Sequence, residues 1–373
     1  MKEEVLVLFF PRNVALQTWV EAGLLDRERR IYETHLETST FQHIYWLTYG
    51  ENDIHYQGLL PKRITVIPMP KLFSFPFGRN LYSFFLPFLQ FRVLRRASRI
   101  KTDQMDGSWA AVLAKLLYRK PLLIRTGFTL SLFMKQEKKW LKSMIATGME
   151  WLAYRFADHA TVSSEEAKKY LRQRYRIPEE KITVVYNYID TERFFPEDGA
   201  SREQRLLFVG RLEPQKNLEP LIRAAAQKGL PLDLYGRGGQ REGLETLART
   251  LNAPVRFLGT VENRKLPMIY NRYRYFILSS LFEGMPKTLL EAMACGCFCL
   301  GTDTLGIREV IREGENGLLA DGFSEEALYR LMERAEEFSE KERVCRQGVE
   351  TIRERFSLTA FWNREAQIFG EMR

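Results

Sequence analysis

Eleven short, mostly apolar runs recur along the chain, and polar or turn-forming residues separate them. Segments with helical spacing of apolar residues, such as 218–226 and 244–251, lie between most of the runs. Short buried strands that alternate with helices are typical of parallel sheets with β-α-β crossovers. Because eleven strands exceed one ordinary sheet, the pattern predicts an α/β chain with two doubly wound sheets. The predicted strands are 5–10, 43–48, 64–67, 122–125, 159–162, 182–186, 206–209, 232–235, 255–258, 275–279 and 297–300.

A polar, turn-rich stretch at 187–204 marks a boundary between two domains. The chain of 373 residues is long enough for two domains of ordinary size, and this stretch separates the strand at 182–186 from the one at 206–209. We therefore predict one Rossmann-like domain over residues 1–190 and a second over 191–356. Ligands of such sheets bind beyond the carboxyl ends of the strands, so two facing domains predict a ligand site in a cleft between them.

Positive charge is concentrated in the first part of the chain. The formal net charge is +9, and residues 1–170 hold 25 Lys and Arg against 16 Asp and Glu, whereas the remainder holds 31 of each sign. A basic domain favours an anionic partner, which could be nucleic acid, the inner leaflet of a membrane or a charged glycan. The alternative is that the basic residues simply cover a solvated surface.

An aromatic stretch over residues 70–96 ends in the arginines Arg92, Arg95 and Arg96. Its longest uncharged apolar piece is well below the ~20 residues that cross a bilayer. Aromatic side chains beside basic ones suit the headgroup region of a membrane, so the stretch indicates interfacial docking. The alternative is that its aromatic residues form ordinary core. They are Phe73, Phe75, Phe77, Tyr82, Phe84, Phe85, Phe88 and Phe91.

The cysteines and the N-terminus favour a cytoplasmic protein. Cys295, Cys297 and Cys299 lie within five positions and Cys345 stands apart, a spacing that fits neither a disulfide framework nor a zinc site. The apolar run at 5–10 is too short for a signal peptide and lacks its flanking residues. A reducing compartment fits both observations.

Two cations follow the strand predicted at 206–209. The strand ends at Gly210, the loop carries Arg211 and Lys216, and a helix begins after Asn217, which we expect to be its N-cap. Cations in a strand-to-helix loop at the carboxyl edge of a sheet are placed to hold a diphosphate. The alternative for either one alone is an ordinary surface cation.

Two glutamates follow the strand predicted at 275–279. Glu283 lies in the loop and Glu291 lies about one turn into the next helix, for which Pro286 suits the first turn and Gly296 the C-terminal cap. The open N–H groups of that first turn form an anion site. Carboxylates accept paired hydrogen bonds from vicinal hydroxyls, so one glutamate suits a sugar ring and the other a ribose.

Together these segments resemble the retaining nucleotide-sugar glycosyltransferases of family GT4, which have the GT-B fold. The resemblance rests on Gly210-Arg211-Leu212-Glu213-Pro214-Gln215-Lys216-Asn217, followed by Glu283 and Glu291 with seven residues between them. It covers about residues 155–320 continuously. The other matching pieces are 158–163, 181–190, 256–259 and 315–319.

The resemblance implies a division of labour between the domains. The domain 1–190 would bind the acceptor, the domain 191–356 would bind the donor, and a helix over about 357–373 would pack back on the first domain. Arg211 and Lys216 would neutralise the donor diphosphate and Glu283 would hold the transferred sugar, which makes these three the predicted catalytic residues. The other donor-binding residues it implies are Gly210, Gly236, Arg237, Val261, Gly284, Met285, Lys287, Thr288 and Glu291.

The first domain departs from the family pattern. Arg12 and Asn13 lie where many members have a Gly-Gly turn, and Thr126 stands where histidine is common. The resemblance places these three residues, with Arg125 and Gly127, on the acceptor side. It also implies that the leaving phosphate, rather than an imidazole, takes the acceptor's proton.

We therefore predict a metal-independent retaining glycosyltransferase of polysaccharide biosynthesis that uses a UDP- or GDP-sugar as co-substrate and needs no cofactor. No Asp-x-Asp clamp occurs in the chain, so cations and a helix N-terminus would stabilise the leaving diphosphate. The predicted acceptor is a glycan or a lipid-linked glycan, with peripheral contact to an anionic membrane at the inner membrane face and no nucleic acid. The alternatives are a nucleotide-sugar epimerase of the same architecture and a basic nucleic-acid-binding protein, although no recognition motif for nucleic acid is visible.

Overall fold

A computed structural model describes residues 3–127, 129–136, 140–199 and 201–372. The chain forms two compact units, of which unit 1 comprises Met1–Val185 and Trp362–Arg373 and unit 2 comprises Tyr186–Phe361. This division falls five residues before the boundary placed after residue 190 from the sequence.

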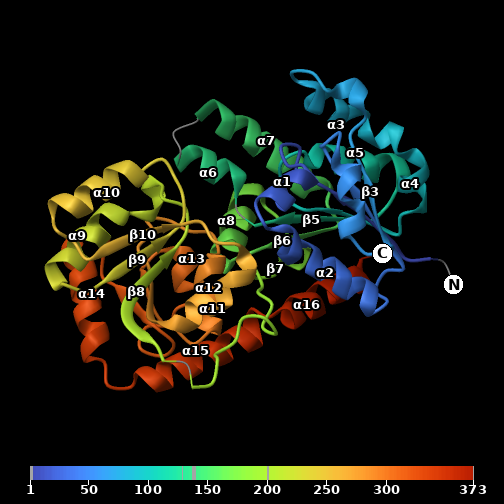
Figure 1. The fold of residues 1–373 in the computed structure, drawn as a ribbon. Helices are drawn as coiled ribbons and strands as arrows, with labels where there is room; N and C mark the ends of the chain where they lie inside the picture. The colour runs from blue at the N-terminus through green and yellow to red at the C-terminus, as the bar shows by residue number, and fades with distance from the viewer. Residues whose placement is uncertain (1–2, 128, 137–139, 200, 373) are drawn as a thin grey trace. The chain divides into compact units, whose positions relative to one another are not determined.

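Unit 1 contains a seven-stranded parallel sheet in the order β3-β2-β1-β4-β5-β6-β7 (Figure 1). Its strands are β1 (Val5–Phe9), β2 (His43–Leu47), β3 (Ile64–Ile67), β4 (Arg99–Thr102), β5 (Leu122–Thr126), β6 (His159–Val162) and β7 (Ile182–Val184). Its helices are α1 (Leu16–Glu21), α2 (Leu25–Glu37), α3 (Gly78–Leu89), α4 (Phe91–Arg96), α5 (Ser108–Tyr118), α6 (Leu130–Gln136), α7 (Trp140–Phe156) and α8 (Glu165–Tyr175), with short 3-10 turns η1 (Asp53–Leu59), η2 (Lys71–Phe73) and η3 (Glu179–Lys181).

Unit 2 contains a six-stranded parallel sheet in the order β10-β9-β8-β11-β12-β13. Helix α9 packs against α10 and α14, and α12 packs against α11 and α15, so the helices line the sheet as two groups, one on either side (Figure 1). The strands are β8 (Glu203–Val209), β9 (Leu232–Tyr235), β10 (Val255–Gly259), β11 (Tyr273–Leu278), β12 (Phe298–Thr302) and β13 (Leu318–Ala320). The helices are α9 (Leu218–Lys228), α10 (Arg241–Thr250), α11 (Leu266–Arg272), α12 (Lys287–Ala294), α13 (Leu305–Arg308), α14 (Glu325–Glu337) and α15 (Lys341–Arg355), with 3-10 turns η4 (Pro214–Lys216) and η5 (Asn263–Lys265).

The predicted α/β class with two parallel sheets is confirmed, and each of the eleven predicted strands has a counterpart. Two strands were missed. Strand β13 has only three residues, and β4 carries Arg99, Lys101 and Thr102, so it shows no apolar run. Yet β4 lies between β1 and β5 in the middle of the sheet of unit 1. Because the buried Lys101 interrupts the apolar pattern, this central strand could not be recognised from the sequence.

The C-terminal helix α16 (Leu358–Glu371) supplies the partner of that lysine. The Glu365 carboxylate lies 2.6 Å from Lys101 Nζ and 2.9 Å from His35 Nε2, and all three side chains are fully buried. Burial alone would raise the pKa of Glu365, but Lys101 and His35 lower it to about 2. Burial lowers the pKa of His35, which favours its neutral form. The cluster therefore ties the end of the chain to the central strand of unit 1.

Replacing Glu365 by Ala leaves Lys101 buried without its counter-charge, so we expect Glu365→Ala to lower the free energy of unfolding by about 3–5 kcal/mol. Because the pKa of Glu365 is lower in the folded state (about 2) than its ordinary value of 4.5, its contribution is complete above about pH 4.5 and is lost as the pH falls toward 2. Denaturant titrations at several pH values measure both effects. The exposed Glu371 on the same helix provides the control, since Glu371→Ala should change stability by less than about 0.5 kcal/mol.

Candidate functional site

The predicted donor-binding residues gather at one edge of the sheet in unit 2. Strands β8, β9, β10 and β11 are neighbours and run parallel, so the loops at their carboxyl ends lie along the same edge. Gly210 and Arg211 follow β8, Gly236 and Arg237 follow β9, and Val261 follows β10. Glu283, Gly284 and Met285 follow β11 and lead into α12, which carries Lys287, Thr288 and Glu291.

An ion pair joins the two loops on either side of this edge. Lys216 Nζ contacts Glu283 Oε1, and both side chains are about nine-tenths buried. Ser280 Oγ donates to the same Glu283 oxygen at 2.5 Å, and Ser279 Oγ donates to the Lys216 carbonyl at 2.8 Å. The glutamate and lysine that were predicted to act on sugar and diphosphate are therefore adjacent, and two serines hold them.

Gln215 joins the same two loops through the backbone. Its carbonyl accepts a hydrogen bond from Leu281 N at 2.9 Å, and its Nε2 donates to the Phe282 carbonyl at 2.8 Å. Arg211 is exposed, and its guanidinium contacts Gln215 Oε1 at 3.4 Å rather than a carboxylate. Within the described structure, the Arg211 guanidinium therefore has no carboxylate partner to neutralise its charge.

Glu291 is buried, whereas a carboxylate that binds a ribose would be expected to be accessible. Tyr270 OH on α11 donates to its Oε2 at 2.9 Å, and burial, together with this carboxylate, raises the pKa of Tyr270. The tyrosine therefore stays protonated and fixes the orientation of the carboxylate. Sequence reasoning missed Tyr270, because nothing in the sequence links a residue 21 positions earlier to Glu291.

The N-terminus of α12 presents its backbone N–H groups without a side-chain cap. Pro286 is its N-cap rather than its first helical residue, and the helix has eight residues. Asn187 Nδ2 donates to the Met285 carbonyl just before it at 3.2 Å, while Lys287 Nζ lies 5.8 Å from the ring centre of Tyr188. The uncapped first turn, which includes Thr288, is suited to an anion.

Glycines allow the loops after β8 and β9 to touch. A Cβ on Gly236, whose φ is 154°, would lie 1.7 Å from the Gly210 carbonyl oxygen, and one on Gly238 would lie 2.2 Å from the Leu212 carbonyl oxygen. Leu212 N donates to the Arg237 carbonyl at 2.9 Å, while the Arg237 side chain is exposed. Side chains at these glycines would separate the two loops.

The remaining donor-side residues have packing contacts. Val261 is partly buried and packs against the core of unit 2, and Met285 is buried. The backbone of Gly284 lies close to Gly306, where an added Cβ would come within 2.1 Å of the Gly284 carbonyl oxygen. Asn217 occupies the N-cap position of α9, as predicted, but its side chain makes no capping hydrogen bond. Its φ is 54°, and its Nδ2 instead donates to the Phe323 carbonyl at 2.8 Å.

In unit 1, Arg12 and Asn13 follow β1 and are held by one aspartate. Arg12 pairs with Asp106 at 3.2 Å, contacts Asn80 and lies over the Trp109 ring, while Asn13 Nδ2 donates to Asp106 at 2.8 Å. These contacts fix both side chains at the carboxyl edge of the sheet.

The predicted acceptor residues at the end of β5 have hydrogen-bond partners within unit 1. Thr126 is buried, and its hydroxyl lies 3.2 Å from Tyr154 OH. Gly127 N donates to Gln104 Oε1 at 3.0 Å, and Arg125 N donates to Thr102 Oγ1 at 3.2 Å. Thr126 therefore has a partner within unit 1 and is not positioned as a free hydroxyl.

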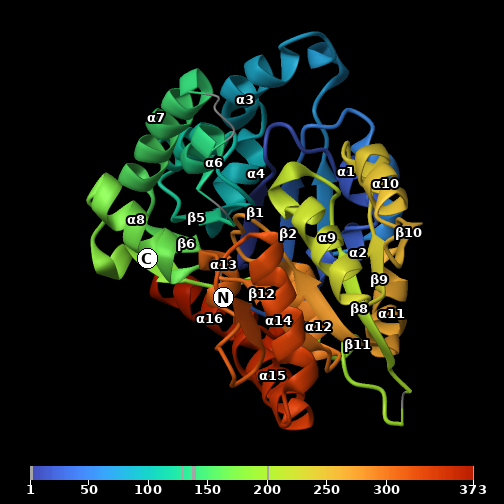
Figure 2. The same cartoon turned by 90° about the vertical axis from the view of Figure 1, so that its left-hand side faces the viewer.

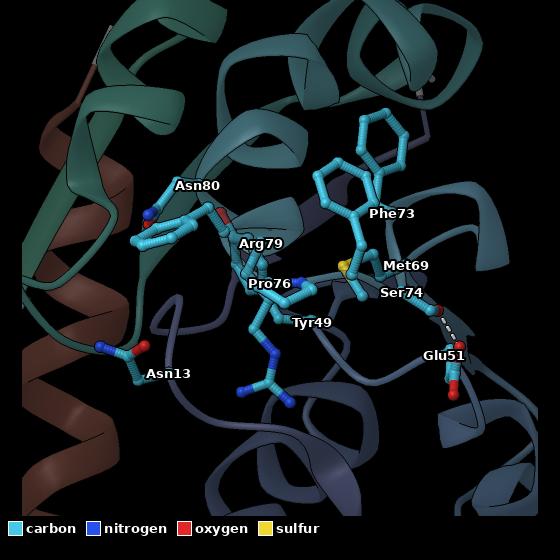
Figure 3. A pocket seen from close by; sticks show the side chains of 11 residues that line it. Asn13, Tyr49, Glu51, Met69, Phe73, Ser74, Pro76, Arg79 and Asn80 are labelled. Atoms are coloured by element: carbon cyan, nitrogen blue, oxygen red, sulfur yellow. Dashed lines mark hydrogen bonds between the residues drawn. The ribbon is translucent and has the colours of Figure 1, made fainter.

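A cavity of about 520 Å³ lies at the same edge of unit 1 (Figure 3). Residues after β1, β2 and β3 line one side of it and the segment from η2 into α3 lines the other. Tyr49 is fully buried on its wall, and its hydroxyl has no hydrogen-bond partner in the described structure. The lining residues are Asn13, Tyr49, Glu51, Met69, Phe73, Ser74, Phe75, Pro76, Phe77, Arg79 and Asn80.

Within the described part of the chain, no three His, Cys, Asp or Glu side chains gather as a metal would require. The cysteines are buried or partly buried free thiols, and burial raises the pKa of Cys297 to about 12. It thus remains a protonated thiol and is not a nucleophile. No helix among the described residues is long and apolar enough to span a membrane.

Comparison with known proteins identifies the family. The sequence pattern of the glycosyl transferases group 1 matches residues 190–351, and that of glycosyltransferase family 4 matches residues 42–193. A protein of Campylobacter jejuni named N-acetylgalactosamine-N,N'-diacetylbacillosaminyl-diphospho-undecaprenol 4-alpha-N-acetylgalactosaminyltransferase is 30% identical over 258 residues, which cover 66% of this chain and 70% of that protein. The chain belongs to the family 4 glycosyltransferases. The predicted enzyme class, a glycosyltransferase, is confirmed.

Solved structures share the fold of this family 4 glycosyltransferase. Anabaena Alr3699/HepE, in complex with UDP and glucose, superposes with a TM-score of 0.76 at 19% identity and covers 98% of this chain and 99% of its own. The lipopolysaccharide outer core galactosyltransferase WaaB superposes with a TM-score of 0.74 at 20% identity, over 99% and 100% of the two chains. These similarities confirm the GT-B fold with its two Rossmann-like domains.

The close contact between the loops after β8 and β9 can be tested for its importance to activity. We expect Gly236→Ala to push Gly210 away and to lower turnover by about a hundredfold, because a shift of about 1 Å in a catalytic loop costs that much. Gly239→Ala is the matched control, since a Cβ there meets only Glu213 Oε1, at 4.0 Å. Steady-state kinetics measure the turnover of both variants. Equal activity of the two variants would show that turnover does not depend on the contact between these loops.

Proposed function

We propose that this glycosyltransferase moves a sugar, with retention of its anomeric configuration and without a metal ion, from a nucleotide-diphosphate sugar to a lipid-linked glycan. The observation that carries the proposal is the convergence of Lys216, Glu283 and the uncapped start of α12 at one edge of unit 2. The solved relative with UDP and glucose supports a nucleotide-sugar donor. Two Campylobacter jejuni relatives whose names contain diphospho-undecaprenol or PP-undecaprenol support the acceptor class.

The charges at this edge match a diphosphate and a sugar. Arg211 and Lys216 would face the phosphate oxygens, and the N–H groups of Lys287 and Thr288 would add the positive end of the helix dipole. Glu283 would accept hydrogen bonds from sugar hydroxyls, and Glu291, held by Tyr270, would accept them from the ribose. The base would lie beside Gly236, Arg237 and Val261.

In the proposed reaction the bond between the anomeric carbon and the diphosphate oxygen breaks, and its electron pair leaves with the diphosphate. The acceptor hydroxyl oxygen forms the new bond on the same face of the sugar, and its proton moves to the departing phosphate oxygen. Arg211 and Lys216 stabilise the negative charge that grows on that oxygen, which is the largest single contribution expected of the protein. Glu283 positions the sugar during the transfer.

Removing either cation tests this proposal. We expect Arg211→Ala and Lys216→Ala each to lower transfer at least about a hundredfold, on the scale of ~2.7–4 kcal/mol per lost charge-stabilising group. Turnover is measured with radiolabelled nucleotide sugars before and after treatment with a chelator, and the wild-type rate should not change on chelation. Arg249→Ala removes an exposed cation of α10 as the control. Near-normal turnover in both variants, or loss of activity on chelation, would contradict the proposal.

We further propose that the acceptor head is received in the cavity of unit 1. Its wall combines aromatic rings, amides, the Arg79 cation and the unpartnered hydroxyl of Tyr49, a mixture that suits both sugar hydroxyls and phosphate oxygens. A buried hydroxyl without a partner costs free energy unless a ligand satisfies it. Tyr49 is therefore expected to bind the acceptor.

Tyr49→Phe should raise the acceptor KM by about tenfold, which corresponds to the ~1–2 kcal/mol of one buried hydrogen bond, and should leave the donor KM unchanged. Tyr82→Phe is the matched control, because the Tyr82 ring packs against Tyr49, with centroids 5.5 Å apart, but does not line the cavity. Kinetics with both substrates varied measure the two constants. Equal effects of the two substitutions would assign Tyr49 a packing role only.

A further inference from the structure

Helix α3 is apolar on two opposite faces. One face packs into unit 1 through Tyr82, Leu86 and Pro87, which are buried. The other carries five large apolar residues at the spacing i, i+3, i+4, i+7 and i+8, each between 45% and 57% exposed. This outward stripe, named the α3 face, consists of Leu81, Phe84, Phe85, Phe88 and Leu89. A water-soluble helix would carry polar residues there.

Exposed apolar residues continue the α3 face at both ends. Leu72, Phe75 and Phe77 precede the helix, and Phe91 follows it. Phe77 is 82% exposed and has a φ of 66°, a left-handed conformation that bulky residues rarely adopt. Of the eight aromatic residues noted in the sequence, Phe73 and Tyr82 are therefore core, and the other six lie at the surface.

Helix α7 exposes a second apolar stripe in the same unit. Helix α5 packs against both α3 and α7, and Figure 2 shows α3 and α7 toward the same end of unit 1. Trp140 is 70% exposed, and Leu141, Met144 and Ile145 continue the stripe on α7. The exposed apolar surface thus extends beyond one helix, as expected of an interaction site rather than of isolated surface residues.

The segment that carries the α3 face contains charged residues of one sign only. Residues 54–102 contain nine Lys and Arg and no Asp or Glu. Arg92, Arg95 and Arg96 follow the face on α4, are exposed and make no ion pair within the described structure. Lys101, the last cation of this segment, is buried and paired with Glu365. The unpaired arginines of α4 therefore lie beside the exposed aromatic surface.

We propose that the α3 face and its flanking arginines dock unit 1 on an anionic lipid bilayer. Aromatic and aliphatic side chains enter the boundary between headgroups and acyl chains, and guanidinium groups pair with lipid phosphates. A protein partner or a second copy of this chain would not require an acid-free segment of 49 residues, whereas an anionic leaflet attracts the exposed arginines of α4. The face lies in the plane of the surface, since α3 with 12 residues is too short to span it.

The docking face adjoins the cavity of unit 1. Phe75, Phe77 and Arg79 line the cavity, and Phe75 and Phe77 also belong to the exposed apolar surface. Docking through this surface brings the mouth of the cavity to the headgroup layer, where the head of a lipid-linked acceptor lies. This consequence rests on the proposed function, but the docking itself does not.

Sedimentation with lipid vesicles tests the proposal. The whole chain should bind vesicles of phosphatidylcholine with one third phosphatidylglycerol and bind pure phosphatidylcholine vesicles weakly. Replacing Arg92, Arg95 and Arg96 together by Gln should lower the partition coefficient about a hundredfold, since each basic residue near an anionic leaflet contributes about a factor of five. Replacing Leu81, Phe85 and Phe88 together by Ser should lower it at least about tenfold and leave only salt-sensitive binding.

Matched controls separate this surface from the overall charge and hydrophobicity. Replacing the exposed Arg249, Arg346 and Arg353 of unit 2 by Gln removes the same net charge, and replacing Leu258 and Met268 by Ser removes exposed apolar groups of unit 2. Both controls should bind vesicles like the wild type. Circular dichroism and nucleotide binding by unit 2 verify that each variant is folded.

Three results would overturn the docking proposal. The first is that the wild type does not bind anionic vesicles. The second is that the controls lose as much vesicle binding as the α3-face variants. The third is that the chain self-associates in analytical ultracentrifugation and that the Ser substitutions abolish this self-association without changing vesicle binding. Loss of nucleotide binding with intact vesicle binding would instead contradict the proposed function and leave the docking supported. The two proposals can therefore fail separately.

Discussion

The ion pair between Lys216 and Glu283 joins the two loops on which the proposed chemistry depends. It joins the loop after β8 to the loop after β11, and Gln215 and Ser280 add hydrogen bonds between or within the same loops. A pair that is nine-tenths buried is costly to leave half satisfied. A bound nucleotide sugar would offer phosphate oxygens to Lys216 and hydroxyls to Glu283, so both groups exchange one partner for another and neither charge is left alone.

The two units place their functional groups by the same rule but secure them differently. In both, parallel strands bring several loops to the carboxyl edge of a sheet. Unit 2 connects its loops through glycines, backbone bonds and the Lys216–Glu283 pair. Unit 1 has its main buried charge cluster at β4, where Lys101 meets Glu365 of the C-terminal helix. The anchor of the chain's end is thus separate from the cavity that Tyr49 lines.

The sequence predicted what depends on local patterns and missed what depends on distant partners. Apolar runs located eleven strands, and the motifs around Lys216 and Glu283 predicted residues that the structure brings to one edge of the sheet of unit 2. Strand β4 was not predicted because the partner that makes a buried Lys101 possible lies 264 residues away, at Glu365. Tyr270 was not predicted because its hydrogen bond to Glu291 forms only in the folded chain. The position of Asn217 at the start of α9 was predicted from its residue type, but its side chain donates to the Phe323 carbonyl instead of capping the helix. Local preference is overridden wherever tertiary contacts offer a better partner.

The sequence alone left the excess charge of the first domain open to two interpretations, and the structure distinguishes them by pairing. A solvated surface mixes both signs, and much of unit 1 does so: Arg12 meets Asp106, and Lys115 contacts Asp158. The segment 54–102 contains no acidic residue. Its Lys101 pairs with Glu365, but the arginines of α4 make no ion pair within the described structure and lie beside exposed phenylalanines. Self-repulsion and exposed aromatic rings both carry a free-energy cost in water. A single anionic, partly apolar surface offsets both costs, which is why a bilayer accounts for the two features together.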